Sequence, residues 1–159
     1  MGLTPDTIGA RVASMSADPA AKTGAPPRRY LVQEMISGGT ELILGFHRDP
    51  LGRAILLGFG GVTAELFKDT ALCLLPAHGR LSREAARALA QALKAWPLLD
   101  GFRGRPKADV EALVSAIVAF SEMAAALADR LIEAEINPLF VLPHGQGVRA
   151  ADGVATLGA

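Results

Sequence analysis

The chain has 159 residues, half of which are hydrophobic, and its sixteen basic residues balance sixteen acidic ones. This length and hydrophobic content are typical of one domain with its own core, and they exclude a disordered chain. Because the net charge is zero, no broad positive field favours a nucleic-acid partner, and any anion site must be local.

The first thirty residues predict a helix and a connecting loop. Thr4-Pro5 is a helix-start signal, because proline is well tolerated in the first turn and apolar side chains follow at helical spacing. We expect the helix to end near Asp18-Pro19. Residues 20–29 contain Gly24 and two prolines and are typical of a loop.

From Tyr30 onwards, short apolar runs separated by turn residues predict an antiparallel meander. The turn at Ser37-Gly38-Gly39 and the turn at residues 49–52 each separate two such runs. Five strands are expected, over residues 30–36, 41–47, 54–59, 63–67 and 70–75.

After Pro76 the apolar period becomes helical and predicts two helices. Ser82 can cap the first, which we expect to end at Pro97. Asp109 follows a proline and opens the second, whose apolar side chains continue to Leu127. A sheet, two helices and a further sheet segment give an α+β layout, with a mostly antiparallel sheet covered on one face by two or three helices.

The closing strands carry acidic and amide side chains. Residues 131–136 alternate apolar and acidic side chains, so Glu133 and Glu135 share one face of the predicted strand. We expect Pro138 to interrupt this run, and residues 139–142 to resume a strand.

A third short strand, over residues 148–151, is expected to deliver Asp152 beside the first two. Carboxylate and amide oxygens are the hard ligands that magnesium prefers, usually together with substrate phosphates. The sequence therefore predicts a cation site that contains Glu135, Asn137 and Asp152.

The segment Glu135-Ile136-Asn137-Pro138, followed by a strand pair that ends in Asp152, resembles the end of an ATP-grasp domain. The resemblance is to the nucleotide-binding domain of NDP-forming acyl-CoA synthetases, the family of ADP-forming acetate-CoA ligase and the succinyl-CoA synthetase beta subunit. It implies that Asn137 and Asp152 ligate Mg²⁺ on the phosphates of ATP or ADP, with Glu135 as a supporting ligand.

The stretch VQEMISGGTEL, residues 32–42, resembles the ATP-grasp hinge. The resemblance implies that the backbone of Gln33 to Met35 and the side chain of Glu34 contact adenine, and that Glu41 contacts the ribose. An extended strand does offer backbone donors and acceptors to a base edge. A plain hairpin with Glu34 and Glu41 in solvent is the alternative, since exposed carboxylates are common.

The glycine-rich segment Gly58-Phe59-Gly60-Gly61 and the charged residues Glu65, Lys68 and Asp69 also match the family pattern. Glycines permit a close backbone approach to phosphate, but a tight turn beside a solvated strand edge is an equally simple interpretation.

A basic loop with Arg103, Arg105 and Lys107 matches as well. Guanidinium groups suit phosphate or a CoA-related anion, whereas a solvated loop before the long helix is the alternative.

The matches run from about Tyr30 to Asp152. They imply that residues 1–29 are a remnant of the N-terminal ATP-grasp subdomain and that residues 30–159 form the C-terminal ATP-grasp subdomain. The resemblance implies part of an ADP-forming acyl-CoA (acetate-CoA) ligase, which interconverts acyl-CoA, ADP and phosphate with the free acid, CoA and ATP.

The missing N-terminal subdomain and the CoA-binding and phosphohistidine domains would then be partners, and the chain is not expected to be active alone. The alternative is a non-catalytic nucleotide-binding or regulatory half-domain, as in fusions with protein lysine acetyltransferases. With one cysteine, no signal-peptide core and no apolar stretch near the roughly 18 residues of a spanning helix, we expect a cytoplasmic protein without a membrane partner.

Overall fold

The computed structural model describes residues 2–23, 27, 29–61, 68–76 and 79–158. The chain divides into two compact units, Met1–Ser37 and Gly38–Ala159. The assignment of residues 1–29 to a remnant of another subdomain stays a prediction.

The described residues of the first unit form a helix and an irregular segment. Helix α1 (Pro5–Thr23) begins where the Thr4-Pro5 signal predicts, and the backbone N–H of Ile8 donates to the carbonyl of Thr4 at 3.1 Å. It continues through Pro19, so the predicted end near that residue is wrong. The hydroxyl groups of Ser16 and Tyr30 share a hydrogen bond, which ties α1 to the segment that follows it.

The predicted strand over residues 30–36 is wrong, because the structure assigns no strand there. A strand requires a neighbour with which to form a hydrogen-bonded ladder, and in the described part of the chain this segment has none. Leu31, Val32 and Met35 are largely exposed as a result.

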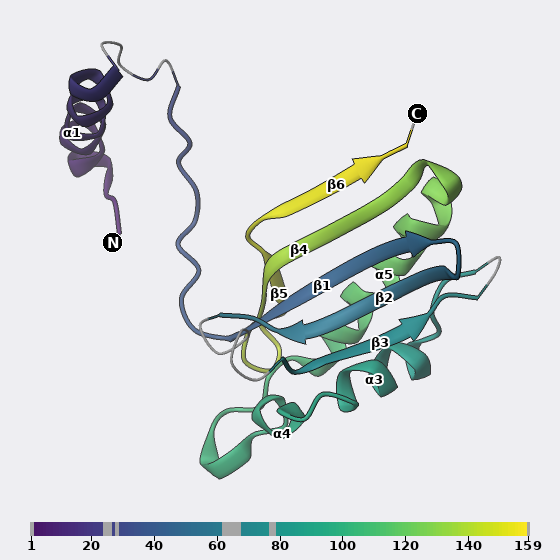
Figure 1. Cartoon of the computed structure of the whole chain (residues 1–159). Coiled ribbons are helices and arrows are strands. Elements are labelled where there is room, and N and C mark those ends of the chain that lie inside the picture. Colours follow the sequence, from purple (N-terminus) through teal and green to yellow (C-terminus); the bar gives the residue numbers. More distant parts are fainter. Residues whose placement is uncertain (1, 24–26, 28, 62–67, 77–78, 159) are drawn as a thin grey trace. The chain divides into compact units, whose positions relative to one another are not determined.

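The second unit is built on one antiparallel sheet (Figure 1), as predicted. Strands β1, β2 and β3 form the expected meander, and the predicted strand over residues 63–67 lies outside the described residues. The order is β3-β2-β1-β4-β5, and β6 pairs with β4 on the same side as β5. The bounds are β1 (Thr40–Asp49), β2 (Gly52–Phe59), β3 (Thr70–Leu74), β4 (Leu131–Val141), β5 (Val148–Ala150) and β6 (Gly153–Leu157).

Among the described residues of this unit, the helices are α3 (Arg83–Gln91), α4 (Trp96–Leu99), η1 (Phe102–Gly104), α5 (Val110–Leu127) and η2 (Ala128–Arg130), where η marks a short 3-10 helix. Ser82 caps α3 as predicted, since its hydroxyl oxygen accepts from the N–H of Ala85 at 3.1 Å. The prediction that this helix runs to Pro97 is wrong: α3 ends at Gln91, and Pro97 lies at the start of α4. Proline suits a first turn, where its missing N–H is not needed.

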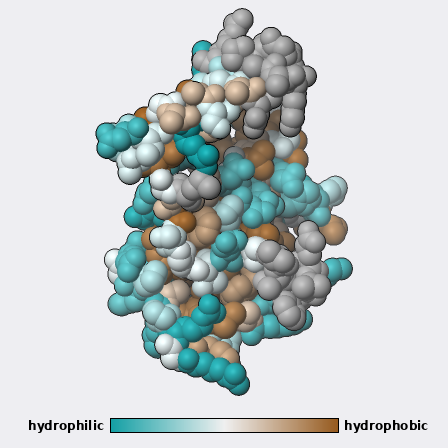
Figure 2. Space-filling model, turned by 90° about the vertical axis from the view of Figure 1, so that its left-hand side faces the viewer, coloured by the Kyte–Doolittle hydropathy of each residue, from teal (hydrophilic) through white to brown (hydrophobic). Residues whose placement is uncertain are grey.

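Helices α3 and α5 lie on the same face of the sheet (Figure 1). The hydrophobic core fills the space between these helices and the sheet. Along β1, Leu42, Leu44 and Phe46 are buried beneath the helices, while the intervening side chains point to the opposite face. That opposite face carries exposed apolar side chains such as Leu72, Leu74 and Val154. In the view of Figure 2, hydrophobic residues are interspersed with hydrophilic ones.

Helix α5 and the turn after it, Val110–Arg130, are long and apolar enough to cross a membrane by length and composition alone. The prediction that no apolar stretch approaches this length is therefore wrong. Leu113, Val114 and Ile117 are fully buried in the core cluster, so the apolar character of α5 has a structural explanation as a core helix.

Strand β4 is continuous through Asn137 and Pro138, so the predicted interruption at Pro138 is wrong. The register with β1 shifts at this point, because Leu42 pairs with Leu139 but Leu44 pairs with Ile136. Two residues of β4 therefore stand opposite one residue of β1, which is a β-bulge. A bulge accommodates proline because the ladder is locally released there. The Asn137-Pro138 peptide bond is cis.

Two buried aspartates anchor the segments around the sheet. Asp69 is 5% exposed, and its carboxylate oxygens accept from the backbone N–H groups of Lys94 and Ala95, each at 2.8 Å. Asp109 caps α5 through the N–H of Ala112 at 3.1 Å and also accepts from the N–H of Gly147 at 2.9 Å. These two side chains hold the helical layer to β3 and to the β4–β5 turn.

Candidate functional site

The three predicted magnesium ligands lie together in one small pocket of the second unit. Its volume is about 190 Å³, and it is lined by Glu135, Asn137, Asp152, Gly153 and Val154. The Nδ2 group of Asn137 donates to Oε1 of Glu135 at 3.1 Å. This orientation turns the amide oxygen of Asn137 away from Glu135 and leaves it available as a ligand.

Asp152 is held in place by backbone hydrogen bonds at the bulge. The N–H of Asn137 donates to the carbonyl of Asp152 at 3.1 Å, and the N–H of Ala151 donates to the carbonyl of Pro138 at 3.1 Å. Asp152 thus stands at the junction of β5 and β6, directly beside the bulged residues of β4. The N–H of Gly153 donates to Oδ1 of Asp152 at 2.8 Å, which fixes the carboxylate locally.

The pocket opens on the face of the sheet opposite the helices. Glu135 pairs with Val154 across the β4–β6 ladder, and Val154 is 66% exposed. Ala134, the neighbour of Glu135 in the strand, is buried on the helical side. Since successive side chains of a strand alternate between faces, Glu135 points away from the core.

The donor set of the pocket fits a hard cation. Within the described ranges, neither Glu135 nor Asp152 forms an ion pair with lysine or arginine. The same part of the chain contains no group of three histidine, cysteine or acidic residues that could hold a metal. Two carboxylates and one amide oxygen leave several positions of an octahedral ion to water and phosphate, which is the usual pattern for magnesium.

The predicted ribose ligand Glu41 lies exposed at the start of β1, against the glycine segment after β2. The N–H of Gly60 donates to the carbonyl of Glu41 at 2.8 Å. A Cβ atom on Gly61 would lie 3.1 Å from Oε2 of Glu41, and Gly61 has a φ of +73°. The glycines therefore allow this segment to approach Glu41 closely, whereas Glu65 lies outside the described residues.

The predicted adenine contacts Gln33, Glu34 and Met35 belong to the first unit. Together with Leu3 and their neighbours along the chain they line a pocket of about 420 Å³. Because these residues and Glu41 lie in different units, a joint role of the two groups in binding a nucleotide stays a prediction.

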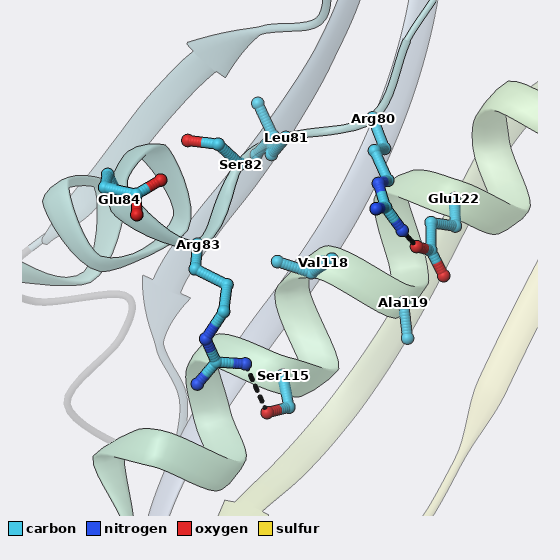
Figure 3. Close-up of a pocket in the computed structure, with 9 residues that line it drawn as sticks. All are labelled: Arg80, Leu81, Ser82, Arg83, Glu84, Ser115, Val118, Ala119 and Glu122. Carbon is cyan, nitrogen blue, oxygen red and sulfur yellow. Dashed lines mark hydrogen bonds and ion pairs between the residues drawn. The ribbon is translucent and has the colours of Figure 1, made fainter.

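A further pocket, of about 520 Å³, lies between the segment that leads into α3 and helix α5. Its arginines are already paired (Figure 3): Arg80 with Glu122, and Arg83 with Ser115 at 3.0 Å. Arg83 also pairs with Glu111 at 2.8 Å. None of the predicted nucleotide or metal residues lines this pocket, and its polar groups act as links between α3 and α5.

Asp69 has a structural role and is not free to bind a ligand, since its buried carboxylate accepts hydrogen bonds from two backbone N–H groups.

The prediction from the sequence missed strand β6, whose Gly153 and Val154 line the cation pocket. The signal was present in the Asp152-Gly153 pair, which is typical of a turn, and in the apolar residues that follow it.

Comparisons with known proteins show the family to which the chain belongs. A family model described as an ATP-grasp domain matches residues 3–157. The chain is 35% identical over 123 residues to the acetate–CoA ligase (ADP-forming) II subunit beta of Pyrococcus furiosus, which covers 77% of this chain and 50% of that protein. It is 34% identical over 123 residues to the 4-hydroxybutyrate–CoA ligase (ADP-forming) of Nitrosopumilus maritimus, covering 77% of this chain and 17% of that protein.

Solved structures show the same fold. An acetyl-coenzyme A synthetase 1 of Candidatus Korarchaeum cryptofilum, in complex with coenzyme A and acetyl-coenzyme A, superposes with a TM-score of 0.80 at 27% identity, over 99% of this chain and 69% of that one. The same synthetase in complex with coenzyme A and Mg-AMPPCP gives a TM-score of 0.69 at 25% identity, over 99% and 74%. The chain belongs to the ATP-grasp domains of ADP-forming acyl-CoA synthetases, and it spans about half or less of the length of the curated relatives named above.

Proposed function

We propose that this chain is the Mg²⁺-nucleotide-binding part of an ADP-forming acyl-CoA ligase. Together with further domains it would interconvert acyl-CoA, ADP and phosphate with the free acid, CoA and ATP. The observation that carries the proposal is the meeting of Glu135, Asn137 and Asp152 in one pocket without a basic partner in the described residues. A relative that carries Mg-AMPPCP supports the choice of ligand.

In this proposal, Asp152 and the amide oxygen of Asn137 hold the metal, and Glu135 orients Asn137 through their hydrogen bond. When bound, magnesium would neutralise charge on the nucleotide phosphates. Glu41 would accept a hydrogen bond from the ribose, and the backbone of Gln33 to Met35 would pair with adenine. We propose that the acyl substrate and CoA bind to other domains of the enzyme, and that the chain needs these partner domains for turnover in the cytoplasm.

The test is the magnesium dependence of ADP binding, measured by calorimetry on the whole chain. We expect ADP to bind more tightly with Mg²⁺ than with EDTA, and Asp152→Asn to weaken the magnesium-dependent binding by about tenfold or more, since a charged contact contributes about 1.5–3 kcal/mol. The ratio of affinities with and without Mg²⁺ should fall towards one in this variant.

Glu133→Gln is the matched control. Glu133 lies on β4 two residues before Glu135 and is exposed, so the variant makes the same change in charge outside the pocket. It should keep the wild-type magnesium dependence. Equal magnesium dependence in Asp152→Asn and the wild type would remove the metal assignment.

A further inference from the structure

The basic loop between α4 and α5 has a defined conformation. Gly101 and Arg103 both have positive φ, at 94° and 52°, and the N–H of Arg105 donates to the carbonyl of Phe102 at 3.3 Å. The guanidinium carbon of Arg103 lies 5.3 Å from the centre of the Phe102 ring. A cation at this distance from a ring face is held there without being neutralised.

The loop is fastened to the sheet at its far end. The N–H of Asp109 donates to the carbonyl of Leu142 at 2.8 Å, and the N–H of His144 donates to the carbonyl of Lys107 at 2.8 Å. The N–H of Ala108 also donates to the carbonyl of Leu99 at 2.9 Å. The position of Arg105 is therefore set by backbone bonds on both sides of the loop.

The charges in this loop are unbalanced. Lys107 forms an ion pair with Asp100 at 2.9 Å, so the positive charge of Lys107 already has a carboxylate partner. Arg103 and Arg105 have no carboxylate partner among the described residues. By contrast, Arg80, Arg83 and Arg87 near the pocket of Figure 3 each pair with a glutamate.

Arg105 lines a pocket of about 150 Å³ at the end of the sheet. Thr40, whose side chain carries a hydroxyl group, lines the same pocket, and Ala108 and Val141 are buried apolar residues of the lining. Gly39 forms part of the lining without a side chain. A Cβ atom there would lie 2.8 Å from the carbonyl oxygen of Val141, and Gly39 has a φ of +87°, so the close packing of this wall requires glycine.

We propose that this pocket binds a phosphate group, with the guanidinium of Arg105 and the hydroxyl of Thr40 as donors and Arg103 as an additional positive charge. Two unpaired guanidinium groups match the charge of a phosphate dianion better than that of a single carboxylate, and the planar guanidinium fork suits its oxygens. Val141 lies four residues beyond Asn137 on β4, about 13 Å along the strand. The site is therefore separate from the cation pocket and goes beyond the proposed function.

The test uses inorganic phosphate in EDTA as the probe and NMR chemical-shift titration of the whole chain as the readout. We expect shifts in the backbone signals of Thr40 and of the loop around Arg105. Arg105→Gln should weaken the apparent affinity by about tenfold or more, because it removes a charged hydrogen bond. Arg103→Gln should weaken it less, since its side chain does not line the pocket.

Two control variants distinguish phosphate binding at this pocket from nonspecific electrostatic attraction and from binding at the cation pocket. Arg130→Gln removes the same charge at the other end of β4 and should leave phosphate binding unchanged. Asp152→Asn should also leave it unchanged, even if magnesium-dependent ADP binding is lost. Equal weakening by Arg130→Gln and Arg105→Gln, acetate binding as tightly as phosphate, or the absence of saturable shifts in the wild type would each overturn the proposal.

Discussion

Replacing Asp69 with alanine is expected to lower the free energy of unfolding by about 3 kcal/mol, because two backbone donors lose a buried acceptor at the same time. The side chain joins the residue before β3 to the turn between α3 and α4, through the N–H groups of Lys94 and Ala95. Its backbone carbonyl also accepts from the N–H of Phe59 at 3.1 Å. Urea unfolding followed by circular dichroism measures the change.

Asp49→Ala is the control for this prediction. Oδ1 of Asp49 likewise accepts from two backbone N–H groups, those of Leu51 at 2.8 Å and Gly52 at 3.1 Å, but it lies in an exposed turn. Water replaces a lost acceptor there, so we expect a loss of about 1 kcal/mol or less. Similar losses in the two variants would show that burial of Asp69 does not govern its contribution.

The second large effect is a pH-dependent loss of stability through Asp109. Hydrogen bonds from the backbone N–H groups of Gly147 and Ala112 hold the pKa of Asp109 below its ordinary value. A carboxyl whose pKa is lower in the folded state stabilises the fold above its unfolded pKa of about 3.9. That contribution is lost as the pH falls through the lower, folded value.

We therefore expect Asp109→Asn to cost about 2 kcal/mol at pH 7, since an amide oxygen can replace one of the two accepted bonds but not both. The difference in free energy of unfolding between wild type and variant should begin to shrink as the pH falls below the unfolded pKa of about 3.9, and it should be lost as the pH falls through the lower, folded pKa. Urea unfolding at several pH values measures it. A difference that stays constant from pH 7 to pH 3 would contradict the role of the charged form.

Glu111→Gln is a useful comparison for this experiment. Hydrogen bonds from Arg87 and then Arg83 lower the pKa of Glu111, but its side chain is exposed. Exposed ion pairs contribute little to stability. The variant should therefore lose clearly less stability than Asp109→Asn at neutral pH, which separates a buried cap from a surface ion pair at the same end of α5.

The sequence predicted the parts of the fold that depend on local patterns. Apolar runs bounded by turn residues located β1 and β2, and the Ser82 and Asp109 caps located the starts of α3 and α5. The grouping of Glu135, Asn137 and Asp152 in one pocket was predicted because the spacing of short strands placed them side by side.

The errors have a common physical origin, because each depends on a partner segment that local patterns do not specify. Residues 30–36 have the composition of a strand but no described ladder partner. Pro138 is compatible with a strand because the register shift at Ile43 releases the ladder beside it. Strand β6 is exposed along its whole length, so its place in the sheet depends on its pairing with β4 and not on a buried face.

The junction of β5 and β6 on a single neighbour, β4, has a consequence for how this domain can vary. The strands β5 and β6 are separated by Ala151 and Asp152 alone. The backbones of these two residues form hydrogen bonds with the bulged residues Pro138 and Asn137 of β4. One inserted or deleted residue there would shift β6 against β4 and turn its side chains over, while β1, β2 and β3 kept their register. The length of this two-residue spacer therefore determines where the carboxylate of Asp152 lies relative to Asn137.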